Sequence, residues 1–364
     1  MNKIKIAFII SNLGQGGAEK QFVELIKNID KTCFEIHLFL YAFNNKMFYY
    51  EILSIEDIII TKNELKNKNI FIKILEALLY LRSILKHNSY DIVFTSLFMN
   101  NLFVYIVAPK RYNNKLVLNN RTSLSYSNKY QLIFYKWMIR KSYIVFNSNK
   151  SLLVFLNKLK WEHHSRVKLI YNGFEKTMNN DHSNTNGDIL FGGLGRQSNE
   201  KNFMQLCRVF NKLSEREKIL LYLKGTEGNQ TMDICKIADG NKRIFLFEAG
   251  NTLEFFNSVH VLVIPSLFEG CPNVLFEALM NKKLCIISKG ANSDNFVTHL
   301  YNGIVYDGTD DDLLDKMELA INLLLNHKGN EIINTGFEYG ISNFSMEKMV
   351  NQYSKLFSDI YENY

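Results

Sequence analysis

The sequence predicts an α/β protein built from two doubly wound domains of similar size. Short apolar runs of strand length alternate with longer runs in which apolar residues recur at helical spacing, a rhythm typical of parallel sheets with helices on both faces. The rhythm stops in the polar, aperiodic stretch 175–187, which indicates a linker, and then starts again. At 364 residues the chain is long enough for two ordinary domains.

The first domain is expected to span residues 1–174. Its first strand is KIKIAFII, followed by the loop SNLGQGG and by AEKQFVELIKNI, which has helical spacing. Helical stretches such as IFIKILEALLYLRSIL separate the later strands. Those strands are FEIHLFL, DIIIT, DIVFT, KLVLN and YIVFN.

The second domain is expected to span residues 188–344. Its strands are DILFGGLG, KILLYLK, RIFLF, HVLVIPS and LCIIS, with a helical stretch after each of the first four. The tail, residues 345–364, has the spacing of one amphipathic helix.

Composition excludes several classes of protein. The longest apolar runs, such as IAFII and VLVI, are far shorter than the roughly 18 apolar residues of a membrane span. The apolar run near the amino terminus is also too short for the core of a signal peptide. Five scattered cysteines without metal-type spacing indicate free thiols in a reducing cytoplasm.

Charge is distributed unevenly along the chain. Residues 1–183 hold 26 basic and 13 acidic side chains, whereas residues 184–364 hold 17 and 23. Residues 100–170 alone carry 13 basic side chains and one acid, Glu162. The two domains are therefore expected to have different partners, and the basic one suits an anionic surface or a phosphate-bearing substrate.

Two acids flank the start of a predicted helix in PSLFEGCPNVLFEALM (265–280). The strand HVLVIPS comes first, and ligands bind at the carboxyl ends of strands in open α/β sheets. Pro272 suits the first turn of the following helix, which places Glu269 on the loop and Glu277 about one turn inside. The N–H groups around Pro272, Asn273 and Val274 favour an anion, with a diphosphate as the natural candidate.

This arrangement suits a nucleotide-sugar, because carboxylates accept hydrogen bonds from vicinal hydroxyls on both sides of the diphosphate. A second segment, FGGLGRQSNEKNF (191–203), ends a strand with glycines and then presents Arg196 and Lys201. Both side chains can reach a diphosphate and offset the charge of a leaving nucleotide.

Simpler explanations exist for several of these residues. Glu277 could be a solvated helix acid, and Arg196 and Lys201 could be ordinary surface charges. Cys271 lies in the site loop, but no paired base is evident, so packing is preferred to a nucleophilic role. The acids 310–312 open a helical stretch, which favours an N-cap cluster over a metal site.

The loop SNLGQGGAEK does not spell the G-x-G-x-x-G fingerprint, because Glu19 occupies the last position. A nicotinamide enzyme is therefore disfavoured.

Together these segments resemble glycosyltransferase family 4, whose members are retaining enzymes of the GT-B fold with a Glu-x7-Glu signature. The matching elements occur in the family's order, from the amino-terminal loop to a late Asn-Gly pair, between about residues 5 and 310. The signature residues that match are Pro265, Ser266, Glu269, Gly270, Pro272, Asn273, Val274, Glu277 and Ala278. The other matching elements are Gly16-Gly17-Ala18-Glu19, Tyr171-Asn172-Gly173, Gly195-Arg196 with Glu200-Lys201-Asn202, and Asn302-Gly303.

The resemblance implies a GT-B architecture, in which the two parallel sheets face each other across a cleft and the tail helix packs back on the first domain. It implies that Glu269, Arg196 and Lys201 are the catalytic residues, and that Glu269 and the backbone of 270–273 hold the transferred sugar. Gly16 and Gly17 would let main chain approach the donor phosphate or the acceptor. The expected donor-binding residues are Gly16, Gly17, Gly195, Gly270, Cys271, Pro272, Asn273, Val274 and Glu277.

One position departs from the family's pattern. Many members carry a His on the loop after the strand that matches KLVLN, but here the loop is NNRTS, with Arg121. A subgroup that builds bacterial surface polysaccharides, including O-antigen, looks similar. Arg121 is a candidate to contact the donor or acceptor phosphate, and a structural ion pair is the alternative.

The stretch 125–143 interleaves aromatic and basic side chains. It predicts either an amphipathic helix with an aromatic core face or a patch that lies on a membrane surface. Nucleic-acid binding would fit the charge, but no nucleic-acid module is visible.

The sequence as a whole predicts a retaining hexosyltransferase in the cytoplasm, peripheral on the inner face of the cell membrane. A hexose would move from a UDP- or GDP-linked donor to a saccharide, expected to be polyprenyl-diphosphate-linked, in bacterial surface polysaccharide biosynthesis. No cofactor and no catalytic metal are expected, because Arg196, Lys201 and the helix dipole supply positive charge. The alternatives are another GT-B nucleotide-sugar enzyme, such as an epimerase or hydrolase, and a catalytically silent partner subunit.

Overall fold

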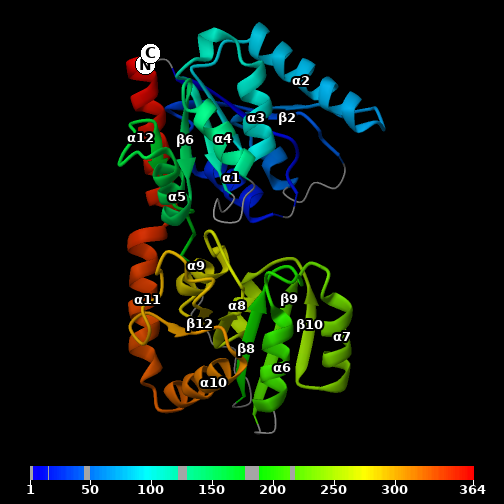
Figure 1. Ribbon diagram of the computed structural model, residues 1–364, viewed down its shortest axis with the longest axis vertical. Helices are drawn as coiled ribbons and strands as arrows, with labels where there is room; N and C mark the ends of the chain where they lie inside the picture. Colours follow the sequence, from blue (N-terminus) through cyan, green and yellow to red (C-terminus); the bar gives the residue numbers. More distant parts are fainter. Residues whose placement is uncertain (1–2, 15, 45–49, 122–128, 177–187, 214–217) are drawn as a thin grey trace. The chain divides into compact units, whose positions relative to one another are not determined.

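The computed structural model describes residues 3–14, 16–44, 50–121, 129–176, 188–213 and 218–364. The chain divides into two compact units (Figure 1), one made of Met1–Gly173 with Met346–Tyr364 and the other of Phe174–Ser345. The corresponding boundaries expected from the sequence are residues 174 and 344. Of the predicted linker, only residues 175 and 176 are among those described.

The first unit contains a seven-stranded parallel sheet in the order β3-β2-β1-β4-β5-β6-β7. Six of its strands coincide with the predicted apolar runs. The strands are β1 (Ile4–Ile10), β2 (Phe34–Leu40), β3 (Ile58–Lys62), β4 (Ile92–Ser96), β5 (Leu116–Asn120), β6 (Ser142–Phe146) and β7 (Val167–Leu169).

Helices cover both faces of this sheet. Alternate residues of β1 point to opposite faces, so Ile6 and Phe8 join one apolar core while Ala7 and Ile9 join another. The helices are α1 (Gly17–Asn28), α2 (Ile70–His87), α3 (Phe98–Val107), α4 (Lys129–Met138), α5 (Asn149–Leu159) and α12 (Met346–Asn363), with short 3-10 helices at Tyr50–Ser54 and Lys110–Tyr112. Helices α1 and α12 belong to the first core, and α2 to α5 belong to the second.

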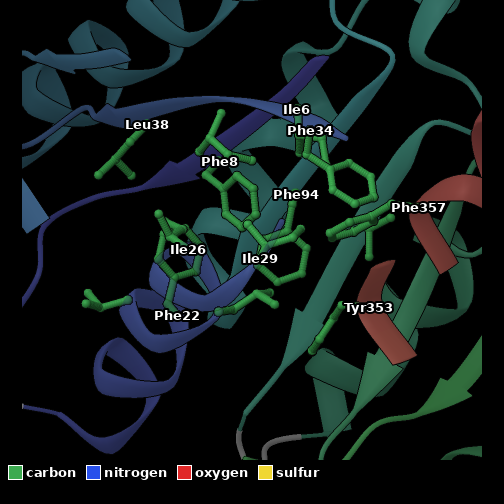
Figure 2. Packing of buried hydrophobic residues seen from close by; sticks show 14 of the residues in the cluster. Ile6, Phe8, Phe22, Ile26, Ile29, Phe34, Leu38, Phe94, Tyr353 and Phe357 are labelled. Carbon is green, nitrogen blue, oxygen red and sulfur yellow. The ribbon is translucent and has the colours of Figure 1, made fainter. Parts of the chain in front are cut away.

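The tail helix α12 completes the first core, as Figure 2 shows. The ring of Phe357 lies against Phe8 and Phe34 at centroid distances of 6.3 and 6.2 Å, and Tyr353 lies 5.5 Å from Phe94. The buried Tyr353 hydroxyl also accepts a 2.9 Å hydrogen bond from the side-chain amide of Asn119. The last residues of the chain are thus part of the core built by the first.

The second unit contains a six-stranded parallel sheet in the order β10-β9-β8-β11-β12-β13. In chain order this is the 3-2-1-4-5-6 arrangement of a Rossmann sheet, which reverses direction between β8 and β11. The strands are β8 (Ile189–Leu194), β9 (Ile219–Gly225), β10 (Ile244–Glu248), β11 (Val261–Ile264), β12 (Leu284–Ser288) and β13 (Ile304–Tyr306).

Two successive glycines in β8 show that helices lie on both faces of this sheet. A Cβ at Gly192 would collide with Phe255 on one face, and a Cβ at Gly193 would collide with Phe203 on the other. The helices are α6 (Phe203–Leu213), α7 (Thr231–Gly240), α8 (Leu253–Ser258), α9 (Asn273–Met280), α10 (Asp310–Leu325) and α11 (Gly329–Phe344). The prediction of two doubly wound, Rossmann-like domains is confirmed.

Candidate active site

A small pocket opens at the carboxyl ends of β8 and β11 in the second unit. This is the point at which the strand order reverses, where open α/β sheets bind their ligands. The pocket lies beside Leu194, Ile264 and Pro265, which end or follow these strands. Lys201, Ser266, Glu269, Pro272 and Val274 also line it.

An ion pair joins the two predicted site segments. Lys201 Nζ lies 2.5 Å from Glu269 Oε1, and the two side chains are 26% and 15% exposed. The Ser266 hydroxyl donates to the same carboxylate oxygen at 2.8 Å. Glu269 is therefore fixed through Oε1, and because it is partly buried this charged arrangement is screened less than a surface pair.

Glycines shape the loop that carries Arg196 and Lys201. Gly195 has φ +146°, which favours glycine, and a Cβ at Gly225 would stand 1.8 Å from the Gly195 carbonyl oxygen. The Gly195 N–H donates to the Lys224 carbonyl at 2.9 Å. The main-chain segments at the ends of β8 and β9 therefore lie very close to each other. The exposed Arg196 comes directly after Gly195.

Hydrogen bonds hold this loop against the loop that bears Glu269. The Leu267 N–H donates to the Glu200 carbonyl at 2.8 Å, and the Asn202 amide donates to the Pro265 carbonyl at 3.3 Å. Burial alone would raise the pKa of the Glu200 carboxyl. The hydrogen bond from its own backbone N–H and the charges of Arg196 and Lys201 outweigh that effect and lower the pKa.

The helix after the Glu269 loop begins one residue later than expected. Pro272 is the N-cap of α9 rather than its first helical residue, and Glu277 lies one turn inside, half-buried. Pro272 and Val274 line the pocket, whereas Gly270, Cys271 and Asn273 are half-buried beside it in the chain. The structure therefore places the signature residues from Glu269 to Val274 around the start of α9.

Two serines that the sequence analysis did not single out support the Glu269 loop. The Ser293 hydroxyl donates to the Glu269 carbonyl at 2.9 Å, and the Ser288 hydroxyl donates to the Ser266 carbonyl. A Cβ at Gly290 would stand 2.1 Å from the Leu267 carbonyl oxygen. In the sequence, the strand LCIIS is followed by the polar stretch KGANS. Because parallel strands end at the same edge of a sheet, this pattern could have predicted that these serines lie near the Glu269 loop.

The glycine pair near the amino terminus lies in the first unit. Gly16 is the N-cap of α1, and Gly17 is its first residue. A Cβ at Gly16 would stand 2.1 Å from Glu19 Oε2, so the immediate reason for this glycine is the carboxylate that folds over it. Burial raises the pKa of Glu19, against a smaller lowering by a hydrogen bond from its own backbone N–H.

Arg121 is also a residue of the first unit. Its guanidinium donates a hydrogen bond to the side-chain oxygen of Asn172, which lies just before the chain leaves this unit at Gly173. Burial raises the pKa of the nearby Tyr353, and the positive charge of Arg121 partly counters this. Arg121 thus contacts the Asn-Gly element that the sequence analysis singled out.

The acids 310–312 form the first turn of α10, and the N-cap is Thr309, whose hydroxyl accepts from the Asp312 N–H at 3.3 Å. Asp310 pairs with Arg208 and Asp312 with Lys316, at 3.3 and 3.2 Å. The expectation that these acids are themselves the cap was therefore wrong by one residue. Among the described residues, no group of three or more His, Cys, Asp or Glu side chains has metal-binding geometry.

None of the helices in the described part of the chain combines the length and apolar character needed to cross a bilayer.

Comparisons with known proteins agree with this fold. A family model described as "Glycosyltransferase Family 4" matches residues 15–177, and one described as "Glycosyl transferases group 1" matches residues 174–334. The solved structures of a glycosyltransferase from Rickettsia africae and of Anabaena Alr3699/HepE in complex with UDP and glucose are each 16% identical. Their TM-scores are 0.82 and 0.78, covering 100% and 98% of this chain and 100% of each of theirs.

A curated relative from Campylobacter jejuni is 25% identical over 331 residues, which cover 88% of this chain and 89% of the relative. Its name is GalNAc-alpha-(1->4)-GalNAc-alpha-(1->3)-diNAcBac-PP-undecaprenol alpha-1,4-N-acetyl-D-galactosaminyltransferase.

The two Rossmann-like units and these structural likenesses define the fold as GT-B, and the family matches make the protein a glycosyltransferase. The family matches, which together run from residue 15 to residue 334, place it more closely. The chain belongs to glycosyltransferase family 4.

Proposed function

We propose that the protein is a retaining hexosyltransferase that moves a sugar from a nucleoside-diphosphate donor to a polyprenyl-diphosphate-linked saccharide. The pathway proposed for it is bacterial surface polysaccharide biosynthesis. The observation that carries the proposal is the Lys201–Glu269 ion pair, 2.5 Å long, beside the amino end of α9 at the switch point of the second sheet. This edge combines a cation, a helix N-terminus and a fixed carboxylate, which suits a diphosphate joined to a sugar.

The donor end of the proposal is supported by structural relatives. Solved structures with this fold include complexes with UDP, with UDP and glucose, and with UDP-glucose. We assign the donor diphosphate to Arg196, Lys201 and the first turn of α9, the ribose hydroxyls to Glu277, and the transferred sugar to Glu269 with the backbone of 270–273.

The acceptor end is supported by the Campylobacter relative. Its name specifies an undecaprenol diphosphate carrying three sugars and an α-linked product. We therefore propose a lipid-linked saccharide as the acceptor of this chain.

The proposed reaction is electrostatic in character. As the nucleoside diphosphate leaves, Arg196, Lys201 and the α9 dipole would stabilise its developing negative charge. The acceptor hydroxyl would attack from the same face of the sugar, so that the configuration is retained without a covalent enzyme intermediate. The same cations would make a catalytic metal unnecessary.

The proposal is tested by mixing the protein with UDP- and GDP-linked hexoses and N-acetylhexosamines, with and without a short-chain polyprenyl-diphosphate saccharide. We expect that one donor releases its nucleoside diphosphate faster when the acceptor is present. NMR of the product should show the anomeric configuration of the donor. Acceptor-independent hydrolysis or epimerisation would favour the alternative GT-B reactions, and inactivity with every donor would favour a silent subunit.

A further inference from the structure

Three adjacent helices of the first unit expose a concentration of large apolar side chains. Helix α3 packs against both α2 and α4 (Figure 1), and the buried sides of all three join the same core on one face of the sheet. Their opposite sides therefore point away from that face together. The exposed members are Ile70, Phe71, Ile72, Leu75, Leu79, Met99, Ile106, Tyr130, Ile133, Phe134 and Trp137.

Helix α2 has the most pronounced apolar stripe. Phe71, which is 79% exposed, is followed at intervals of four by the exposed Leu75 and Leu79, so the three lie on one side of the helix. Arg82 and Lys86 continue that side toward the carboxyl end, and both are exposed. A surface helix of a soluble monomer normally turns polar residues outward, so this stripe indicates a partner.

Helix α4 adds aromatic rings to the same outward surface. Tyr130, Phe134 and Trp137 are exposed at helical spacing, while Tyr135 between them is buried. Trp137 lies 4.4 Å from the ring of Tyr105 on α3, which ties the two helices together. The stretch 125–143 was expected to form either an amphipathic helix with an aromatic core face or a membrane-surface patch, and the described part of α4 has features of both. Tyr126 lies outside the described residues.

Charge decides which partner fits. Within the residues described for α2, α3 and α4, Glu76 is the single acid, whereas the exposed basic side chains include Arg82, Lys86 and Lys136. Arg140 and Lys141 follow α4 directly and are also exposed. Exposed apolar and aromatic side chains bordered by basic ones are complementary to an anionic bilayer, which takes up rings at its interface and attracts Lys and Arg.

We propose that the outward sides of α2, α3 and α4 dock the enzyme on an anionic lipid surface, with Phe71, Leu75 and Leu79 entering the interface. The purpose of this docking rests on the proposed function, because a lipid-linked acceptor resides in a bilayer. The surface is larger than the aromatic-basic stretch of α4, and its apolar part lies mainly on α2.

The test uses the full chain without donor or acceptor, so that it is independent of the transfer reaction. Binding is measured by co-sedimentation with vesicles of phosphatidylcholine alone and with phosphatidylglycerol added. We expect binding to the anionic vesicles at low salt, release at high salt, and a blue shift of tryptophan fluorescence that disappears in Trp137→Phe. Equal, negligible binding to both vesicles overturns the proposal.

Two variants locate the surface. Phe71→Ser/Leu75→Ser/Leu79→Ser should lose binding at least tenfold, whereas Met232→Ser/Leu325→Ser, which changes exposed apolar residues of the other unit, should bind like the parent. Arg82→Gln/Lys86→Gln should bind about 30-fold more weakly, since each basic residue contributes about fivefold at an anionic surface. The matched control Lys348→Gln/Lys355→Gln lies on α12, which covers the opposite face of the sheet.

The remaining outcomes are also decisive. Parent-like vesicle binding by the triple serine variant overturns the assignment to α2. A concentration-dependent dimer that this variant abolishes, without vesicle binding by the parent, would instead assign the surface to self-association. Transfer to a detergent-free, short-chain acceptor should be unchanged in the triple variant; failure of transfer in the parent contradicts the proposed function and not the docking surface.

Discussion

At the scale of single residues, the carboxylate of Glu269 is the best-defined group of the candidate site. Lys201 and Ser266 both bind Oε1, and Ser293 holds the backbone of the same residue. The resemblance implies that Lys201 binds the phosphate and Glu269 the sugar, but nothing in the sequence indicates that the two side chains pair. That pairing depends on main chain contacts between two loops distant in sequence, such as Leu267 N–H to the Glu200 carbonyl.

Removing either proposed diphosphate ligand should reduce catalysis far more than stability. Arg196→Ala or Lys201→Ala is expected to cost about 2–4 kcal/mol of transition-state stabilisation, by analogy with lost oxyanion donors. The measurement is kcat/KM for the donor, with thermal unfolding as the check on folding. Lys236→Ala on α7, a 73% exposed lysine side chain of the same unit, is the matched control. Unchanged kcat/KM in either test variant contradicts the assignment.

At the scale of elements, periodicity predicts the long strands and fails for the shortest. The strands β7 and β13 have three residues each, too few to show alternation, and both lie at sheet edges. Helix α2 was predicted from its spacing, but its apolar outer side was not, because apolar residues on both sides of a helix indicate burial before the packing is known. Which of the two sides of the helix is buried is decided by its packing against the sheet and the neighbouring helices.

A buried lysine lies directly before β12 and should destabilise the second unit at neutral pH. Lys283 is 5% exposed, and burial lowers its pKa from 10.5 to about 8. Burying the charged lysine costs stability only at a pH at which Lys283 is protonated in the unfolded chain. This free-energy cost is therefore absent above the unfolded pKa, grows as the pH falls from about 10.5 to 8, and is complete below 8. A shift of this size corresponds to about 3 kcal/mol as an upper limit.

We therefore expect Lys283→Met to raise the free energy of unfolding by roughly 1–3 kcal/mol at pH 7. The gain over the parent should shrink between pH 8 and 10.5, as urea unfolding at several pH values would show. Transfer activity should be unchanged, because Lys283 lies at the amino edge of the sheet and the pocket at the carboxyl edge. A gain that is absent at pH 7, or constant to pH 10.5, would refute this explanation.

At the scale of the whole molecule, the sequence predicts the two parallel sheets, the family and the residues around the switch point of the second sheet. Chain order and strand length were enough for the sheets, because parallel strands joined by helices have few allowed arrangements. The return of the tail to the first unit came from resemblance, and the structure explains it: Tyr353 and Phe357 fill the core beside Phe8 and Phe94.

Activity should also survive removal of divalent cations, if Arg196, Lys201 and the α9 dipole supply the positive charge. The check is transfer in excess EDTA, followed by titration with Mg²⁺, which is allowed to speed product release. A complete loss of transfer activity in EDTA that Mg²⁺ restores would contradict the metal-free proposal. It would make the acids of the first turn of α10 candidate metal ligands again.

In the proposed function, the Glu269 site transfers sugar from a nucleoside-diphosphate donor to a lipid-linked saccharide. Mass spectrometry of the acceptor after reaction with the active donor tests it most directly, in the parent and in Glu269→Gln. The acceptor should gain the mass of one sugar, matched by an equal amount of released nucleoside diphosphate. The folded Glu269→Gln variant should lose about 30- to 1000-fold in rate, equivalent to roughly 2–4 kcal/mol. An acceptor that gains no mass while nucleoside diphosphate is released, or a Glu269→Gln variant with parent activity, would contradict it.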